Sequence, residues 1–248
     1  MSSIRLNKIS TRAAKGINKE KIKAKTTKLL EELSELQNLL FAESKHAVLV
    51  VIQGMDASGK DGLIRNVLGK LNPQGVQVQS FKAPTPEELS HDFLWRIHQH
   101  APAKGMIQLF NRSHYEDILV TRVHKWCDEK LAIERMKAIN DFENLLVNHN
   151  NTHILKFYLH ISPEEQNKRL LERIKEPGKQ WKYNEKDFEE AKLWNDYMHA
   201  YEDCFNHCDK VPWTIVPSDQ NWYKEYIVAS KLFNLLKGLD MRYPGLKK

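Results

Sequence analysis

Apolar residues along the chain follow two different spacings. Between Lys19 and about Phe41 they recur at helical intervals, which predicts an amphipathic helix. The next stretch, AVLVVIQG, is continuously apolar and rich in β-branched residues, which is typical of a strand buried on both faces. Four later stretches predict further strands: VQVQSF, GMIQLF, HILKFYL and WTIVP.

Helical patterns separate these predicted strands. They cover residues 63–71, 86–100, 115–122, 129–149, 163–175 and 222–239. Strands that alternate with helices of this length are typical of a parallel sheet covered on both faces. A length of 248 residues suits one elaborated domain better than two. We therefore predict a single α/β domain, residues 1–248, around a five-stranded parallel sheet with helices on both faces.

Two segments differ in composition from the rest of the chain. Residues 176–184, EPGKQWKYN, are turn-rich, basic and aromatic, and they predict a lid over about residues 174–190. The first 28 residues hold nine Lys or Arg and one acid, Glu20. We expect this arm to be a solvated, partly helical surface segment, with nucleic-acid or membrane binding as the alternative. Organelle import is disfavoured because most of its basic residues are lysines.

The overall composition narrows the class of protein further. A content of 41% hydrophobic and 28% charged residues indicates a globular chain, and no apolar run approaches the length of a membrane span. Three cysteines cannot form a disulfide framework, which favours a reducing compartment and, by default, the cytoplasm. A net charge of +6 would attract polyanions if the basic side chains converged on one cleft.

Residues 54–62, GMDASGKDG, match a phosphate-binding loop, G-x-x-x-x-G-K, except that Asp61 stands where the motif has Ser or Thr. The stretch lies between a predicted buried strand and a predicted helix start, which is the context that the motif requires. The ammonium group of Lys60 would add a point charge to the loop. Phosphate oxygens are further expected to contact the backbone N–H groups of Ala57, Ser58, Gly59 and Lys60.

Two aspartates lie within this loop, although uncompensated carboxylates repel phosphates. A divalent cation would resolve the conflict. Asp56 is suited to hold Mg²⁺, with Mn²⁺ as an alternative, because magnesium takes a few carboxylates together with phosphate oxygens and water. Asp61 belongs to the phosphate-contacting positions by its place in the motif, but its simplest role is to face the helix dipole in the first helical turn.

A second polar cluster, NRSHYEDIL, follows the predicted strand GMIQLF. In phosphoryl-transfer folds this strand end usually carries an aspartate that holds the metal ion. Asn111 occupies that place, so Glu116 or Asp117 would have to supply the carboxylate. Arg112 is suited to clamp a transferring phosphoryl group, and a surface ion pair is its alternative role.

Several motifs stand in order between about residues 35 and 240: GMDASGKDG, FLWR, FNRSHYEDIL, NKRLLERI and KQWKYNEKDFEEAKLWNDYMHAYE. This set resembles the family-2 polyphosphate kinases. The resemblance implies a P-loop kinase fold of the thymidylate-kinase type with a helical lid. It also implies transfer of phosphoryl groups between inorganic polyphosphate and nucleotides, with magnesium.

The resemblance assigns roles to charged residues in the loop, the second motif and the lid. Magnesium and the acceptor would be positioned by Asp56 and Asp117. The catalytic set would comprise Asp56, Lys60, Arg112, Asp117 and Arg173. Basic residues bordering or within the lid would be Arg169, Arg173, Lys179 and Lys182. A track of positive charge for polyphosphate would add Lys82 and Arg122, for which solvated surface charges are the alternative.

The acceptor is indicated by the sequence His114, Tyr115, Glu116. Family members that phosphorylate diphosphates tend to carry Trp-Tyr-Asn there, whereas this form resembles the class III group, which also accepts monophosphates. We therefore expect AMP and ADP as acceptors, with guanine nucleotides as the alternative. Their contacts would come from Asn111, Arg112 and Glu116. We expect neither nucleic-acid nor membrane partners, and we expect a homo-oligomer, either a dimer or a tetramer.

Two other functions compete with this interpretation. A nucleoside monophosphate kinase of the thymidylate kinase type would share the fold but use a nucleoside triphosphate donor. Its loop should continue Lys-Ser or Lys-Thr and its strand should end Asp-Arg, whereas this chain has Lys60-Asp61 and Asn111-Arg112. A non-catalytic module that binds polyanions or nucleic acid would have no use for Asp56 and Asp117, because carboxylates weaken anion binding.

Overall fold

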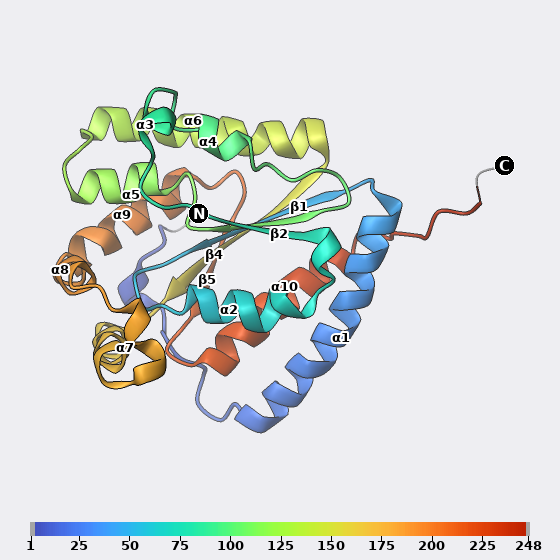
Figure 1. Cartoon of the computed structure of the whole chain (residues 1–248), viewed down its shortest axis with the longest axis horizontal. Coiled ribbons are helices and arrows are strands. Elements are labelled where there is room, and N and C mark those ends of the chain that lie inside the picture. Colours follow the sequence, from blue (N-terminus) through green and yellow to red (C-terminus); the bar gives the residue numbers. More distant parts are fainter. Residues whose placement is uncertain (1–2, 247–248) are drawn as a thin grey trace.

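The computed structural model describes residues 3–246, which are arranged around one parallel sheet (Figure 1). The order of the five strands across the sheet is β2-β3-β1-β4-β5, and every pair of neighbours is parallel. The strands are β1 (Ala47–Gln53), β2 (Val76–Ser80), β3 (Ile107–Asn111), β4 (Thr152–His160) and β5 (Trp213–Pro217). The predicted five-stranded parallel sheet is therefore confirmed.

Helices cover both faces of the sheet, as Figure 1 shows. One face carries α1 (Lys19–Glu43), α2 (Lys60–Val67) and α10 (Asn221–Lys237). The other face carries α5 (Glu116–Val123), α6 (Glu129–Asn150) and α9 (Trp194–His207). Beyond the end of the sheet lie α7 (Pro163–Lys175), the 3-10 helix η4 (Pro177–Lys182) and α8 (Lys186–Lys192). Shorter 3-10 turns are η1 (Leu6–Lys8), η2 (Leu68–Lys70) and η3 (Pro73–Gly75).

The central strand β1 holds the two helical layers together. Its side chains alternate between the faces, so Val48 and Val50 pack into the core under α1 and α10, and Leu49 and Val51 pack into the core under α5, α6 and α9. Every residue of β1 is buried. Each aliphatic side chain buried in this way contributes about 1.5–3 kcal/mol, which fixes the end of the strand where the phosphate-binding loop begins.

The region between β2 and β3 departs from the prediction. The single helix expected over residues 86–100 is wrong, because the structure has two short helices, α3 (Pro86–Leu89) and α4 (Trp95–His98). Thr85 and Glu88 form a capping box that starts α3. The side chain of Asp92 then accepts the N–H of Leu94 at 2.9 Å, which holds the chain in a turn between the helices.

Most described residues of the basic arm are exposed, in line with the expected surface segment, but its first part is also anchored to the body of the protein. Leu6 is buried, and its N–H donates to Glu202 of α9 at 2.7 Å. The Thr11 hydroxyl donates to Asp219, which follows β5, at 2.9 Å. Regular helix begins only at Lys19, with the start of α1. Within residues 3–246, none of the helices is both long enough and apolar enough to cross a membrane.

Candidate active site

A cavity of about 1030 Å³ opens where the carboxyl ends of β1 and β3 face α7, η4 and α8. Such a position, outside the carboxyl ends of the strands, is where open α/β sheets bind ligands. Most predicted site residues line it: Asp56, Ala57, Gly59, Lys60, Asp61, Lys82, Asn111, Arg112, Arg169, Arg173 and Lys182. Four others do not line it: Ser58, Glu116, Asp117 and Arg122.

The loop between β1 and α2 bends through two left-handed residues, Ala57 at φ 60° and Gly59 at φ 93°. The N–H of Ser58, expected to face phosphate, donates to the carbonyl of Met55 at 3.1 Å and so closes a turn inside the loop. The Lys60 ammonium donates to the carbonyl of Gly54 at 2.6 Å and to that of Met55 at 3.2 Å. Burial lowers the pKa of Lys60, although the nearby Asp56 carboxylate opposes this.

Asp56 and Arg112 face each other across the cavity floor. The Nη2 group of Arg112 donates to Oδ1 of Asp56 at 2.8 Å. Burial alone would raise the pKa of Asp56, but the charges of Lys60 and Arg112 outweigh it and hold the pKa below its ordinary value. Asp56 is therefore ionised at neutral pH. Arg112 therefore forms an ion pair, which the sequence analysis named as its alternative role. The partner of Arg112 is Asp56, a carboxylate of the phosphate-binding loop.

The start of α5 carries Glu116 and Asp117, which face different surroundings. Burial raises the pKa of Glu116, while the positive charges of Arg112 and Lys60 act against the rise. Burial also raises the pKa of Asp117, to about 6, but the cations acting on that carboxylate are Arg135 and Arg96. The cations that act on Glu116 are therefore those of the loop and Arg112, whereas the cations that act on Asp117 come from α4 and α6.

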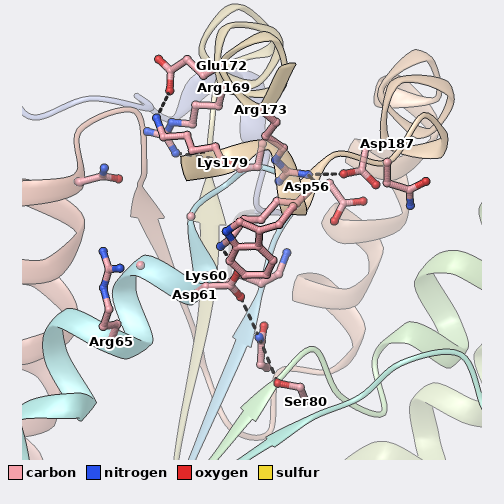
Figure 2. Close-up of a pocket in the computed structure, with 18 of the residues that line it drawn as sticks. Asp56, Lys60, Asp61, Arg65, Ser80, Arg169, Glu172, Arg173, Lys179 and Asp187 are labelled. Carbon is pink, nitrogen blue, oxygen red and sulfur yellow. Dashed lines mark hydrogen bonds and ion pairs between the residues drawn. The ribbon is translucent and has the colours of Figure 1, made fainter. Parts of the chain in front are cut away.

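Asp61 joins the loop to the lid. It lies in the first turn of α2, as expected, and its carboxylate accepts the Lys182 ammonium at 2.6 Å. The amide of Asn111 also donates to it at 3.3 Å (Figure 2). Burial opposes the effect, but the hydrogen bond from Lys182 holds the pKa of Asp61 below its ordinary value. The residue that replaces the usual hydroxyl of the motif therefore bridges three elements, α2, β3 and η4.

The lid cations bind carboxylates of the lid or its flanks. Arg173 pairs with Asp187 of α8, and Lys179 pairs with Glu172 at 2.8 Å (Figure 2). Sequence reasoning missed Asp187, because it lies in an acidic and basic helical stretch, KDFEEAK, that reads as an ordinary exposed helix. Burial and the nearby Asp56 carboxylate raise the pKa of Asp187, against the effect of Arg173.

Arg169 lines the cavity but turns its guanidinium to protein oxygens. Its Nη1 donates to the carbonyls of Ala57 and Ser58, both at 3.1 Å. Its Nη2 donates to the carbonyls of Ser218 at 2.8 Å and Asp219 at 3.0 Å. The Nε–H donates to Glu165 at 2.9 Å. An arginine side chain has five N–H donors, so each has a protein acceptor.

Arg122, expected in the polyphosphate track, lies elsewhere. Its guanidinium donates to Glu129 at 2.7 Å and to Asp203 at 2.9 Å, which ties α5 to α6 and α9 outside the cavity lining. Lys82 does line the cavity, and its side chain is exposed. Of the two basic residues for which solvated charges were the alternative, only Lys82 faces the cavity.

A buried polar network supports the second motif. The Tyr115 hydroxyl donates to Glu143 of α6 at 2.7 Å, and the Lys156 ammonium of β4 donates to the same carboxylate at 2.7 Å. The side chains of Glu143 and Lys156 are fully buried. Removing one partner of a buried ion pair destabilises a protein by about 3–5 kcal/mol. The network therefore holds Tyr115, and with it the chain just before Glu116, in place. Tyr115 belongs to the second motif, but Glu143 and Lys156 form no recognisable motif in the sequence.

The donor set of the cavity fits a magnesium ion that is held mainly by its substrate. In the part of the chain that the structure describes, no group of three or more His, Cys, Asp or Glu residues could hold a metal. Magnesium commonly uses one or two carboxylates plus phosphate oxygens and water. Asp56 meets this requirement, since it is ionised, lines the cavity and has one oxygen on Arg112. The Asp117 side chain lies outside the cavity lining.

Comparison with known proteins agrees with this architecture. The family model described as Polyphosphate kinase 2 (PPK2) matches residues 16–244. The chain is 47% identical to an AMP/ADP-polyphosphate phosphotransferase of Meiothermus ruber, over 87% of this chain and 81% of the relative. It is 44% identical to an ADP-polyphosphate phosphotransferase of Rhodopseudomonas palustris, over 87% and 79%.

A solved structure extends the likeness to three dimensions. The crystal structure of Polyphosphate Kinase 2 from Arthrobacter aurescens TC1 superposes with a TM-score of 0.96 at 41% identity. The superposition covers 100% of this chain and 90% of that one. With the family model matching nearly the whole chain, the protein belongs to the polyphosphate kinase 2 family.

Proposed function

We propose that this protein is a polyphosphate-dependent nucleotide kinase that transfers the terminal phosphoryl group of inorganic polyphosphate to AMP and ADP. The observation that carries the proposal is a phosphate-binding loop whose cavity is lined by Arg112, which directly follows β3, and by Arg173 and Lys182 from the lid. An anhydride chain of phosphates carries a negative charge along its whole length, so it suits a cavity lined with cations on several sides. The relatives named above support the same donor and acceptors.

The reaction that we propose is a direct in-line transfer. A phosphate oxygen of the acceptor attacks the terminal phosphorus, the bond to the bridging oxygen breaks, and the shortened chain leaves with the electron pair. Lys60 and Arg112 stabilise the charge that spreads over the transferring group. The lid excludes water from it. Because the bond broken and the bond formed are both phosphoanhydrides, with AMP as well as with ADP as the acceptor, the reaction runs in either direction according to concentrations.

Magnesium would be held by Asp56, and we propose Asp117 as the second carboxylate. Bound there, the ion neutralises phosphate charge and aligns donor with acceptor. We propose that Asn111 and Arg112, which line the cavity, contact the acceptor nucleotide together with Glu116, whose pKa is affected by the charges of Arg112 and Lys60. Adenine is our proposed base, since the relatives named above act on AMP or ADP.

Product formation with polyphosphate as sole donor tests the proposal. The protein should make ATP from ADP, and ADP from AMP, when supplied with polyphosphate and Mg²⁺. Activity only with a nucleoside triphosphate donor would instead indicate a kinase of the thymidylate kinase type. The variant Asp117→Asn separates catalysis from binding. In a kinase this variant should lose turnover by orders of magnitude and still bind polyphosphate. A non-catalytic binding module would show no turnover in the wild type, and its variant would bind polyphosphate as tightly or more tightly.

We also propose that the protein acts in the cytoplasm as a homo-oligomer. Cys127, Cys204 and Cys208 are all free thiols, which suits a reducing compartment. The helix α6 exposes Ile133, Leu145 and other apolar side chains that a subunit contact would cover. Light scattering on the purified protein should report a dimer or a tetramer, and a monomeric mass would contradict this part of the proposal.

A further inference from the structure

Lys224 of α10 contacts the phosphate-binding loop but does not line the cavity. Its side chain is almost completely buried, with 1% of the residue exposed. The ammonium donates to the carbonyls of Ser58 at 3.1 Å and Gly59 at 3.2 Å, and to the Asn221 side chain at 3.0 Å. An ammonium has three N–H donors, so all three are used within the protein. Lys224 therefore contacts the loop and not the ligand.

Arg169 holds the same loop from α7. It binds the carbonyls of Ala57 and Ser58, so the Ser58 carbonyl accepts from both cations. The opposite edge of its guanidinium binds the carbonyls of Ser218 and Asp219, which follow β5. Two buried or nearly buried cations thus hold three consecutive carbonyls, those of Ala57, Ser58 and Gly59.

These contacts determine where the N–H groups of the loop point. In a planar trans peptide the carbonyl of one residue and the N–H of the next point in opposite directions. Because Lys224 holds the carbonyls of Ser58 and Gly59, the N–H groups of Gly59 and Lys60 point away from its ammonium, and both of these residues line the cavity. Those groups stand at the start of α2, where N–H groups bind anions.

Gly59 fits this arrangement for a steric reason as well as a conformational one. Its φ of 93° is unfavourable for a side chain. A Cβ at this position would also lie 2.3 Å from the Lys224 Nζ, so any side chain would push the ammonium off the loop carbonyls. The glycine of the motif and the buried lysine of α10 are therefore matched to each other, 165 positions apart.

We propose that Lys224 and Arg169 are positioning residues that orient the N–H groups of the phosphate-binding loop toward polyphosphate by holding the loop carbonyls. The role of polyphosphate as ligand rests on the proposed function. Neither cation needs to touch the phosphate chain. A buried lysine without a carboxylate partner destabilises the fold. Its role in holding the loop explains why a lysine stands at this buried position.

The test compares Lys224→Met with Lys231→Met, an exposed lysine on the same helix. Binding of tripolyphosphate by calorimetry, and kcat and KM for polyphosphate, are measured on the full chain. Lys224→Met should weaken tripolyphosphate binding about tenfold and raise KM by a similar factor, with a smaller change in kcat, because the loop loses two charge-assisted hydrogen bonds. Lys231→Met should match the wild type, and Lys224→Arg should recover part of the affinity.

Thermal unfolding distinguishes positioning from a general structural role. Unchanged tripolyphosphate affinity in Lys224→Met, with only a lower melting temperature, would overturn the proposal. Arg169→Lys supplies a second variant, since a lysine keeps the charge but has three donors in place of five. It should also weaken tripolyphosphate binding. If the wild type transferred no phosphoryl group from polyphosphate, the proposed function would fail, but tripolyphosphate affinity would still report on the loop.

Discussion

The phosphate-binding loop and the lid both surround one cavity with cations, but their cations have different partners. Lys60, Arg169 and Lys224 at the loop donate mainly to backbone carbonyls. Arg173, Lys179 and Lys182 at the lid pair with carboxylates. A backbone carbonyl inside a packed loop stays in place when a ligand arrives. A side-chain carboxylate near the surface competes with phosphate for the same cation.

This difference assigns separate tasks to the two regions. The loop is organised before its ligand binds, so little free energy is lost in arranging its N–H groups. Partly exposed ion pairs of the lid contribute only about 0–1 kcal/mol each, so exchanging a carboxylate for a phosphate oxygen costs little. We therefore expect the lid to open and close on polyphosphate while the loop keeps its geometry.

The largest effect should follow from removing Lys60, the lysine of the loop that lines the cavity. Lys60→Met should lower kcat with polyphosphate on the order of a thousandfold, because a preorganised positive charge is lost where the phosphoryl group transfers. Initial rates of ATP formation from ADP measure this, with Lys231→Met as the matched control. A loss of less than tenfold would mean that the N–H groups and lid cations carry the charge stabilisation without Lys60.

The next effect is a pH dependence of stability above pH 7 that arises from Lys224 at the loop. Burial, reinforced by the charge of Arg169, lowers the pKa of Lys224 to about 7 from an ordinary value of 10.5. Between those values the unfolded chain binds more protons than the folded one, so stability rises with pH. Below pH 7 both states hold the proton and the slope vanishes.

The measurement compares unfolding of the wild type with that of Lys224→Met across this range. The free energy of unfolding of the wild type should rise relative to the variant by at most about 1.4 kcal/mol per pH unit. Other charged groups near the ammonium are Arg169 and Glu165 of α7, Lys60 of α2 and Glu225 of α10, and both proteins retain them. Parallel curves would show that Lys224 keeps its proton in the fold.

The two regions also differ in how far the sequence predicts them. The loop was recognisable because its glycines, Lys60 and the preceding apolar strand are contiguous in the chain. The partners of Lys224 and Arg169 were not, because a backbone carbonyl leaves no trace in the sequence and the contacts join residues more than 100 positions apart. Residue type shows that a side chain is basic, but not whether it will face ligand or backbone.

Local side-chain chemistry explains the clearest error in the fold. The apolar spacing over residues 86–100 predicted one helix, but the Asp92 side chain accepts the N–H of Leu94 and so favours a local turn between two short helices. The same limit applies to Asp187, whose importance depends on its distance from Arg173 and Asp56 in the folded chain. The spacing of apolar residues indicates which face of an element is buried. It does not indicate where a polar side chain interrupts a helix or which polar side chains meet in the folded protein.

A smaller effect should link Gly59 to Lys224. Gly59→Ala should weaken tripolyphosphate binding about tenfold, partly from backbone strain at positive φ and partly from displacing the ammonium. In the Lys224→Met background the second part is already lost, so the same substitution should cost less. A double-mutant cycle on tripolyphosphate affinity measures the coupling. Additive effects would mean that the two residues act on the loop independently.

The smallest effect should come from a lid carboxylate. Asp187→Asn keeps the size of the side chain but removes the negative charge that pairs with Arg173 and lies near Asp56. If the carboxylate competes with phosphate, KM for polyphosphate should fall by about threefold, in keeping with the modest strength of a partly exposed ion pair. The gain should shrink as salt is raised, because salt screens charges that face solvent.

Glu176→Gln is the matched control for this substitution, since Glu176 pairs with Lys179 at 2.9 Å but is more exposed than Asp187 and does not line the cavity. Its effect on KM should be smaller than that of Asp187→Asn at every salt concentration. A rise in KM for Asp187→Asn would reverse the interpretation: the carboxylate would then hold Arg173 in the orientation that binds phosphate. The lid would in that case be organised before its ligand binds, as the loop is. Asp187 would then hold Arg173 in its binding orientation, just as hydrogen bonds to backbone carbonyls hold Arg169.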